Sequence, residues 1–286
     1  MPELPEMQAL AERLGAAVGG SELTALHPLQ FSALKNVADT SALIGRTVEG
    51  IGRRGKYLVW SVRPSGGERE GADRTRLLIH LSQGGRIDVE TPPKATKPKG
   101  ALLRLTFAND TAVLLKEFGT ERKAGWWVLG PGDDGPLTVL GPEPGSDEFR
   151  DLLLTGQDRR RVHTILRDQR TVSGIGRGYT DDALHRACLS PYASLASLTP
   201  EERQRLLDAI DEVMAAGLEA ERRRTGGLPP KVGDHWVVHK RWGTPCPVCG
   251  EELQRVSYES YEVTYCPHCQ TGGKVLADRR LSRLLK

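Results

Sequence analysis

The sequence predicts an α+β fold: an N-terminal β-sandwich with one flanking helix, a linker, and a C-terminal helical domain that carries a zinc-finger β-hairpin. After one helical stripe, short apolar runs broken by Gly, Pro, Asn and Asp fill the first half of the chain. Helical periodicity replaces them in the second half, and two Cys-x-x-Cys pairs lie near the C-terminus. The predicted boundaries are 1–129 for the sandwich, 130–147 for the linker, 148–235 for the helical domain and 236–286 for the zinc hairpin.

Length and composition indicate a globular protein of two domains. The chain has 286 residues, of which 38% are hydrophobic and 27% are charged, enough for two hydrophobic cores. No run approaches the ~20 apolar residues of a membrane span, and the N-terminus does not resemble a signal peptide, so we expect a cytoplasmic protein without a membrane partner. The net charge is only +3. Arginine runs at 159–161 and 222–224 are typical of solvated faces, although arginine rather than lysine favours phosphate recognition.

The first six residues, Met-Pro-Glu-Leu-Pro-Glu, form a pattern suited to covalent chemistry. Removal of Met1 would leave Pro2 with a secondary amine beside the carboxylate of Glu3. An α-amino group titrates near ~7.7–8.0, and a neighbouring cation lowers that pKa further. A secondary amine that attacks an aldehyde gives an iminium that stays positive, which suits elimination from a sugar. The alternative is that Pro2, Glu3 and Glu6 only begin a helix, where carboxylates complement the dipole.

The elements of the first half are predicted from periodicity. An apolar stripe indicates a helix over 4–18, which Gly19 and Gly20 end. The short apolar runs predict a β-sandwich with strands at 46–51, 57–62, 76–81, 86–89, 101–107, 112–115 and 126–129.

A basic segment, Arg53-Arg54-Gly55-Lys56-Tyr57, stands at the entry to one of these strands. One interpretation is charge that protects a sheet edge from pairing with other chains. The other is a phosphate clamp, in which Lys56 would also lower the pKa of the terminal amine.

The second half is predicted to be helical around a tight turn. Helical patterns cover 149–154, 162–167 and 183–188, and Gly174-Ile175-Gly176 precedes the last of them. The backbone amides of such a turn form an anion site, although the bare pattern is also that of a helical hairpin. Thr199 and Glu202 form a capping box that opens a long amphipathic helix. Cys188 is expected to be a small buried hydrophobe.

Cys246, Cys249, Cys266 and Cys269 give the strongest metal signal in the chain. Four thiolates in tetrahedral array on a β-hairpin are the ligands of a structural zinc ion, and they leave no position open for substrate. Two disulfides are the alternative, which a reducing compartment disfavours.

The hairpin between the cysteine pairs combines aromatic and basic residues. Tyr258, Tyr261 and Tyr265 accompany Arg255 in this segment. Aromatic faces stack on bases and arginine binds phosphate, so the hairpin is predicted to contact nucleic acid. His268 lies between the last two cysteines and is expected at the surface rather than on the metal.

Taken in this order, the motifs resemble those of the formamidopyrimidine-DNA glycosylase/endonuclease VIII family, over nearly the whole chain. The motifs are the PELPE terminus, a sandwich, a lysine after a basic strand entry, a helix–two-turn–helix and a four-cysteine zinc hairpin. Supporting stretches are Ile79-His80-Leu81, Leu140-Gly141-Pro142-Glu143-Pro144, Asp168-Gln169, Gly174-Ile175-Gly176 and Tyr265-Cys266-Pro267.

The resemblance implies a bifunctional DNA glycosylase/AP lyase of base-excision repair. Pro2 is implied as the Schiff-base nucleophile, Glu3 as the acid/base at the sugar, Glu6 as a supporting carboxylate and Lys56 as a phosphate ligand. The implied reaction flips a damaged base from the DNA, releases it after attack at C1′, and cuts the strand by β,δ-elimination. Structural Zn²⁺ is the implied cofactor, and no redox or nucleotide cofactor is needed.

Two phosphate-binding positions depart from the family pattern. Arg177 stands where the family usually has asparagine, and a guanidinium keeps the charge with different geometry. Tyr261 stands where the zinc hairpin usually has arginine, which removes a charged hydrogen bond typically worth ~1.5–3 kcal/mol. Arg255 and Arg177 are the candidates to compensate for that loss.

The residues expected to fill the space of a flipped nucleotide also differ. Gln83 stands where methionine is common, Arg122 matches the arginine that reads the opposite base, and Ala124 replaces the usual phenylalanine. Stacking is worth ~1–3 kcal/mol per base, so a missing aromatic wedge favours distorted or single-stranded DNA over intact damaged duplex. The lesion itself is not specified, because the loop at 225–234 that often holds the extruded base is short and rich in Gly and Pro.

Two functions therefore remain open at this point. The retained Pro2, Glu3, Glu6 and Lys56 favour the enzyme, which is expected to act as a monomer associated with the nucleoid. Loss of the hairpin arginine favours a catalytically weak lesion- or structure-specific DNA-binding paralogue. A zinc-bearing transcription factor leaves the N-terminal motif unexplained.

Overall fold

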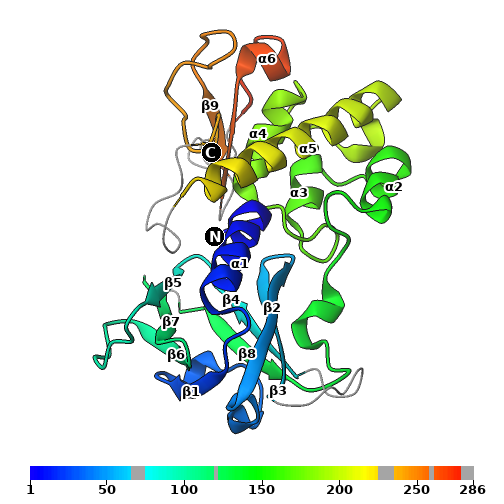
Figure 1. The fold of residues 1–286 in the computed structure, drawn as a ribbon. Coiled ribbons are helices and arrows are strands. Elements are labelled where there is room, and N and C mark those ends of the chain that lie inside the picture. The colour runs from blue at the N-terminus through cyan, green and yellow to red at the C-terminus, as the bar shows by residue number, and fades with distance from the viewer. Residues whose placement is uncertain (66–74, 119–121, 225–234, 258–260, 278–286) are drawn as a thin grey trace. The chain divides into compact units, whose positions relative to one another are not determined.

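Two compact units make up the computed structural model of the chain, which describes residues 1–65, 75–118, 122–224, 235–257 and 261–277 (Figure 1). Unit 1 comprises Met1–Val139 and the end of the long helix α5 (Pro200–Arg222) from Leu218 onward. Unit 2 comprises Leu140–Gly217 and the described residues from His235 onward. The finer division into four parts stays a prediction. Within the described ranges, no helix is both long and apolar enough to cross a bilayer.

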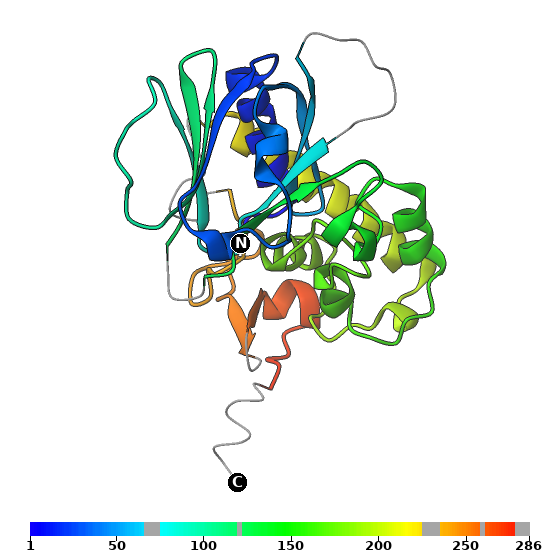
Figure 2. The ribbon, with the colours of Figure 1, turned by 90° about the horizontal axis from the view of Figure 1, so that it is seen from below.

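Unit 1 is the β-sandwich that the sequence predicts, formed by two antiparallel four-stranded sheets with one long helix (Figure 2). One sheet has the order β2-β3-β4-β8 and the other the order β1-β6-β7-β5. The elements are α1 (Leu4–Val18), β1 (Leu23–Pro28), η1 (Phe31–Ala33), η2 (Thr40–Leu43), β2 (Arg46–Arg54), β3 (Tyr57–Pro64), β4 (Thr75–His80), β5 (Gly85–Glu90), β6 (Ala101–Phe107), β7 (Thr111–Glu117), β8 (Gly125–Leu129) and η3 (Gly135–Val139).

A single hydrophobic core joins both sheets to α1. Met7, Leu10 and Leu14, spaced as on one face of a helix, are completely or almost completely buried in it. Trp60 of β3 stacks on Phe107 of β6 with ring centroids 6.1 Å apart, so an aromatic pair spans the two sheets. This packing fixes α1, and with it the N-terminal residues, against the sandwich.

Strand β1 has no counterpart in the sequence prediction. Its burial does not alternate with period two, because a register shift between Leu23 and Ala25 interrupts its pairing with β6. It is an edge strand and ends at Pro28, which donates no backbone hydrogen bond. A bulged edge strand of this kind carries no alternating pattern from which it could be predicted.

Unit 2 is helical and carries a two-stranded hairpin. Its elements are α2 (Asp147–Thr155), α3 (Val162–Arg167), α4 (Arg177–Arg186), η4 (Leu195–Ser197), α5 up to Gly217, β9 (Gln254–Ser257), β10 (Glu262–Tyr265) and α6 (Pro267–Thr271). The capping box of α5 is confirmed, since Thr199 accepts from the backbone N–H of Glu202 at 3.2 Å and Glu202 accepts from that of Thr199 at 2.9 Å.

Helix α4 begins six residues earlier than the apolar pattern predicts. Gly176 caps it and Arg177 is its first residue. Gly178 is required in the first turn, because a Cβ there would lie 2.2 Å from the ring of Trp236. Asp182, in the same helix, accepts the backbone N–H groups of Val237, Val238 and His239 at 2.9–3.1 Å. Helix α4 is therefore the frame on which the segment leading to the zinc hairpin is held.

The expectation that Cys188 is buried is wrong. This residue is exposed and has a φ of 56°. Helix α4 has already ended, with Ala187 as its C-terminal cap. The side chain therefore leaves the apolar face on which helical spacing would have placed it.

Candidate functional site

Strand register gathers several predicted site residues at one end of the sandwich. His80, the last residue of β4, pairs with Tyr57 on one side and with Gly125 on the other. Lys56 directly precedes Tyr57, and Arg122 lies just before Gly125. The turn between β2 and β3, the end of β4 and the start of β8 therefore lie at the same end of one sheet.

The N-terminal carboxylates form a buried pair at the start of α1. Glu3 is the N-cap residue, and Glu6 accepts its backbone N–H at 2.8 Å. The Glu3 carboxylate in turn accepts the backbone N–H of Glu6, which completes a capping box. Glu3 and Glu6 are only 5% and 8% exposed. Both carboxylates are thus held in place by the backbone of the helix that they begin.

Burial gives Glu6 an unusual proton affinity. Desolvation, followed by the negative charge of Glu3, raises the pKa of Glu6 from 4.5 to about 7. A carboxyl group that titrates near neutral pH exchanges protons readily under physiological conditions. Glu6 can therefore hold or release a proton near neutral pH, next to the Glu3 side chain at the helix start.

The pKa of His80 reflects the positively charged groups near its ring. Its pKa is lowered to about 4 by burial, then by the positive charges of Lys56 and of the terminal amine. The ring also packs on Tyr57, with centroids 4.7 Å apart. The structure thus brings together the N-terminus, which includes the half-buried Pro2, with the buried Lys56 and the half-buried His80. Sequence reasoning gave no role to His80, whose only signal was a family-like Ile79-His80-Leu81 stretch.

Gln83 and Arg122 are exposed. Gln83 lies just before β5 and Arg122 lies after β7, and these two strands pair with each other at this end. Gly84, next to Gln83, accepts the backbone N–H of Phe118 at 2.9 Å. The carboxylate of Glu117 accepts the N–H groups of the two residues after Arg122, each at 2.9 Å. Ala124 is buried and offers no wedge, whereas the ring of Phe118 is 52% exposed at this end. The sequence gave no sign of Phe118, because only pairing places it beside Gln83.

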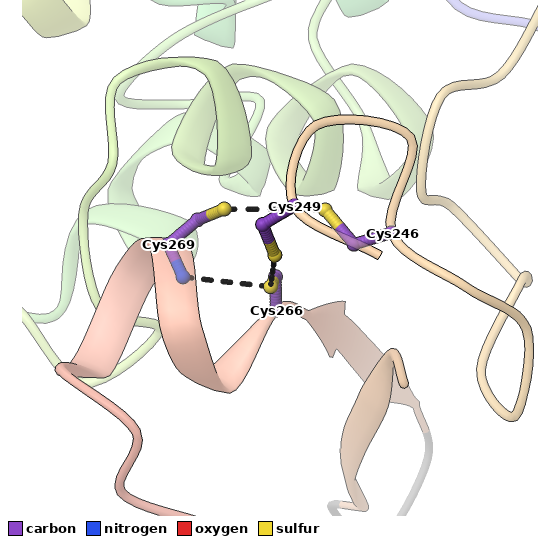
Figure 3. Close-up of side chains that lie close together, drawn as sticks. All are labelled: Cys246, Cys249, Cys266 and Cys269. Carbon is purple, nitrogen blue, oxygen red and sulfur yellow. Dashed lines mark hydrogen bonds between the residues drawn. The ribbon is translucent and has the colours of Figure 1, made fainter. Parts of the chain in front are cut away.

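In unit 2 the four predicted cysteine ligands lie together (Figure 3). Their sulfur atoms are all within 4.8 Å of one another. The Sγ atoms of Cys249 and Cys266 are 3.4 Å apart and those of Cys246 and Cys269 are 4.0 Å apart, so neither pair is a disulfide. Sulfur atoms around a tetrahedral ion at ~2.3 Å lie roughly 3.8 Å from one another. The cluster therefore fits a four-coordinate metal ion such as zinc.

Neighbouring side chains brace the cysteine cluster. The Nε2 atom of His185 on α4 lies 3.2 Å from the sulfur of Cys246. A thiolate only accepts, so Nε2 carries the proton when Cys246 binds a metal. Gln270 accepts the N–H of Cys266 and donates to the carbonyl of Leu189, both at 2.8 Å. Sequence spacing pointed to the ligands but not to these supports. His268 is exposed, as predicted.

The predicted nucleic-acid-binding residues of unit 2 have different surroundings. Arg177 begins α4 and is half-buried. Arg255 forms an ion pair with Glu262 at 2.8 Å, and its guanidinium lies 3.9 Å from the ring centroid of Trp242. Arg255 is therefore engaged by its own hairpin.

The described tyrosines of the hairpin, Tyr261 and Tyr265, also differ in their surroundings. The ring of Tyr261 lies under the guanidinium of Arg167, 3.6 Å from the carbon atom to the centroid. The prediction that Tyr265 offers its face to nucleic acid is wrong, because it is fully buried and its hydroxyl accepts the N–H of Leu276 at 2.7 Å. Tyr258 lies outside the described residues, as does the loop at 225–234.

Family models match both halves of the chain. The formamidopyrimidine-DNA glycosylase N-terminal domain matches residues 1–127, and the formamidopyrimidine-DNA glycosylase H2TH domain matches residues 140–226. The chain belongs to the formamidopyrimidine-DNA glycosylase family. A formamidopyrimidine-DNA glycosylase of Thermus thermophilus is 32% identical over 288 residues, which cover 96% of this chain and all of that protein. An uncharacterised formamidopyrimidine-DNA glycosylase-like protein of Mycobacterium tuberculosis is 42% identical over 155 residues, which cover 52% of this chain and 95% of that one.

Solved structures of the family share the fold. A Lactococcus lactis Fpg in complex with abasic-site DNA has a TM-score of 0.79, with 24% identity over 94% of this chain and 99% of that one. A complex of the same enzyme with DNA containing an oxidised pyrimidine also has a TM-score of 0.79, at 24% identity over 94% of this chain and 100% of that one. The predicted fold class and family are thereby confirmed.

Proposed function

We propose that this member of the formamidopyrimidine-DNA glycosylase family is a bifunctional DNA glycosylase and AP lyase that removes oxidised bases in base-excision repair. The observation that carries the proposal is the cluster of the N-terminus, Lys56 and His80 at the sandwich end, with the carboxylates Glu3 and Glu6 at the head of α1. Nearby cations favour the neutral, nucleophilic form of an amine. The buried carboxyl of Glu6, with a pKa of about 7, lies beside Glu3 and suits a site where protons are transferred.

The proposed reaction begins after removal of Met1, which frees the secondary amine of Pro2. The amine attacks C1′ of a nucleotide that has been flipped from the helix, and the damaged base leaves with the bonding electron pair and takes up a proton. Ring opening gives an iminium between Pro2 and C1′. Loss of a proton from C2′ then expels the 3′ phosphate, and a second elimination expels the 5′ phosphate. Glu3 is the proposed acid/base for these proton transfers, with Glu6 beside it.

The remaining residues are proposed to hold the DNA. Lys56 and Arg177 bind phosphate groups, while the exposed Gln83 and Arg122 face the opposite strand and the space left by the flipped nucleotide. Zn²⁺ held by the four cysteines supports the hairpin and takes no part in the chemistry, because a ZnS₄ site has no open position. We infer that the protein acts as a monomer at the nucleoid on damaged or distorted DNA.

Reductive trapping tests this function. Incubation with abasic-site DNA and borohydride should give a covalent protein–DNA adduct, and strand cleavage should occur when the reductant is left out. A Pro2→Gly variant should trap far less. Equal trapping by that variant would overturn the assignment of the nucleophile.

A DNA-binding paralogue with weak turnover is the second candidate function. It is favoured by Tyr261, which replaces a charged phosphate ligand, and by Arg255, which is paired with Glu262. Tight binding to abasic-site DNA without adduct or cleavage would support this alternative over the enzyme.

A further inference from the structure

Arg167 and Tyr261 form a contact that the proposed catalytic and DNA-binding roles do not use. Arg167 is the last residue of α3, and its guanidinium lies over the Tyr261 ring at 3.6 Å. His163, one turn earlier on the same helix, lies 5.8 Å from that ring between centroids. Residues four apart share a helix face. Tyr261 therefore packs along one face of α3 and fixes where the arginine head lies.

The Arg167 guanidinium has no acidic partner in the part of the chain that the structure describes. Its side chain contacts the ring of Tyr261 and is half-buried. Burial and the positive charges of Arg167 and Arg161 lower the pKa of His163 to about 4, so His163 adds no second cation near pH 7. A fixed guanidinium that no carboxylate neutralises is suited to an external anion.

Arg255 provides the internal comparison. Its guanidinium also lies over an aromatic ring, that of Trp242, but it is neutralised by Glu262. Of these two arginines on aromatic rings, only Arg167 keeps its net positive charge available.

The surroundings of Arg167 also favour an anion. The side-chain amide of Gln169, two residues further on, accepts from Gly174 N–H at 3.0 Å and donates to the Ile175 carbonyl at 2.7 Å. It thereby ties the end of α3 to the turn before α4, where Arg177 follows. Arg167 ends α3 on one side of this turn, and Arg177 begins α4 on the other side, so the turn leads into the N-terminal end of the α4 dipole.

We propose that Arg167, positioned by the ring of Tyr261, binds a phosphodiester group of the DNA. This inference rests on the proposed function, since DNA is the ligand. The Tyr261 ring covers one face of the Arg167 guanidinium. The guanidinium N–H groups lie in the plane of the group and can donate to phosphate oxygens. Tyr261 is a positioning residue that acts through its ring rather than its hydroxyl. Arg167 thus supplies the positive charge that the hairpin lacks at Tyr261.

Binding of the zinc-loaded, full-length protein to a duplex with a tetrahydrofuran abasic analogue tests this, by fluorescence anisotropy over a range of salt concentrations. Arg167→Ala should weaken binding about tenfold and reduce the slope of log K against log salt by about 0.9. Tyr261→Leu should weaken binding to a similar extent, whereas Tyr261→Phe should bind as the wild type does. Arg167→Ala combined with Tyr261→Leu should be no weaker than Arg167→Ala alone.

Arg186→Ala is the matched control, because it removes the same charge from unit 2 but from an arginine paired with Glu212. It should leave affinity and slope unchanged. Zinc content and melting temperature check the fold, and Arg167→Gln, which keeps the stem over Tyr261, replaces Arg167→Ala should that variant unfold.

Unchanged affinity and slope in the Arg167 variants, with tight binding by the wild type, would overturn this inference alone. Equal losses of DNA affinity in Tyr261→Phe and Tyr261→Leu would show that the hydroxyl of Tyr261 causes the effect. They would contradict the proposal that its ring positions Arg167. Failure of the wild type to bind the abasic duplex would instead refute the proposed function.

Discussion

Two regions, the end of the sandwich near the N-terminus and the contact between Arg167 of α3 and Tyr261, are held in place by different interactions. At the sandwich end, Lys56 and His80 are brought together by strand register, and Glu3 and Glu6 by a capping box over one helical turn. In the second region, Arg167 of α3 and Tyr261 of the hairpin are far apart in the sequence and meet through side-chain packing. The first arrangement is therefore built on backbone hydrogen bonds between neighbouring strands and within one helical turn. The second depends only on which two side chains meet.

Removal of a metal ligand should give the largest effect and confine it to unit 2. Structural zinc contributes about 10–16 kcal/mol of binding free energy in zinc-finger peptides. Cys266→Ser should therefore lose the metal and unfold the hairpin, while the sandwich keeps its cooperative melting transition. Elemental analysis and calorimetry measure the two outcomes. Cys188→Ser, which changes an exposed cysteine, should behave as the wild type does. A full metal complement in Cys266→Ser would refute the ligand assignment.

Substitution of the helix-capping acid should affect chemistry much more than the fold. Glu3→Gln can still accept the backbone N–H of Glu6 but no longer exchanges a proton. Base excision in single-turnover assays should fall by about 10²–10⁴-fold, with an unchanged melting temperature. Glu12→Gln on the same helix changes a carboxylate that pairs with Arg222, and it should excise normally. A small effect of Glu3→Gln would show that the sandwich end is a structural cap only.

The raised pKa of Glu6 predicts a pH-dependent stability. Because the pKa is about 7 in the folded protein, against an ordinary value of 4.5, the folded form holds the proton more tightly than the unfolded chain does. The contribution of Glu6 to the free energy of unfolding is therefore fully present below about pH 4.5, and it is lost as the pH rises through 7. Glu6→Gln should be more stable than the wild type at pH 8, by up to about 3 kcal/mol, and the difference should vanish near pH 4.5. Denaturant unfolding at both pH values measures it, and a constant difference would contradict the burial account.

Loss of the hydrogen bond to Cys246 should give a smaller effect. His185→Phe keeps the packing on α4 but removes the N–H group beside the sulfur. Partners of this kind typically contribute 10–100-fold in metal affinity, about 1.4–2.7 kcal/mol. Competition with a chromogenic chelator should show that weakening, while His268→Phe, at an exposed site, should show none. Unchanged affinity in His185→Phe would show that the four cysteines alone set it.

Features set by local sequence were predicted well. The capping box of α5 and the extent of α1 follow from spacing over a few residues, and the four-cysteine cluster follows from two Cys-x-x-Cys pairs. Strand β1 was missed because a bulge and an edge position erase the alternating pattern on which strand prediction depends. Cys188 was misplaced because the helix ends at Arg186, two residues before the chain takes a positive φ at Cys188.

Features set by distant contacts escaped prediction. Nothing in the sequence near Tyr261 indicates that Arg167 covers its ring, and nothing near Cys246 indicates His185. Arg255 was a candidate to replace the missing hairpin arginine, yet Glu262 on the neighbouring strand β10 forms an ion pair with it and neutralises its charge. Such pairings depend on how α3, α4 and the hairpin pack, which periodicity does not encode.

The most direct test of the account is to locate the covalent bond to DNA. The intact mass of the purified protein should first show that Met1 has been removed. After reaction with abasic-site DNA and borohydride, nuclease and protease digestion followed by mass spectrometry should place the sugar remnant on the nitrogen of Pro2. A remnant on Lys56 or another lysine, or a protein that keeps Met1 and still forms the adduct, would contradict the proposed mechanism.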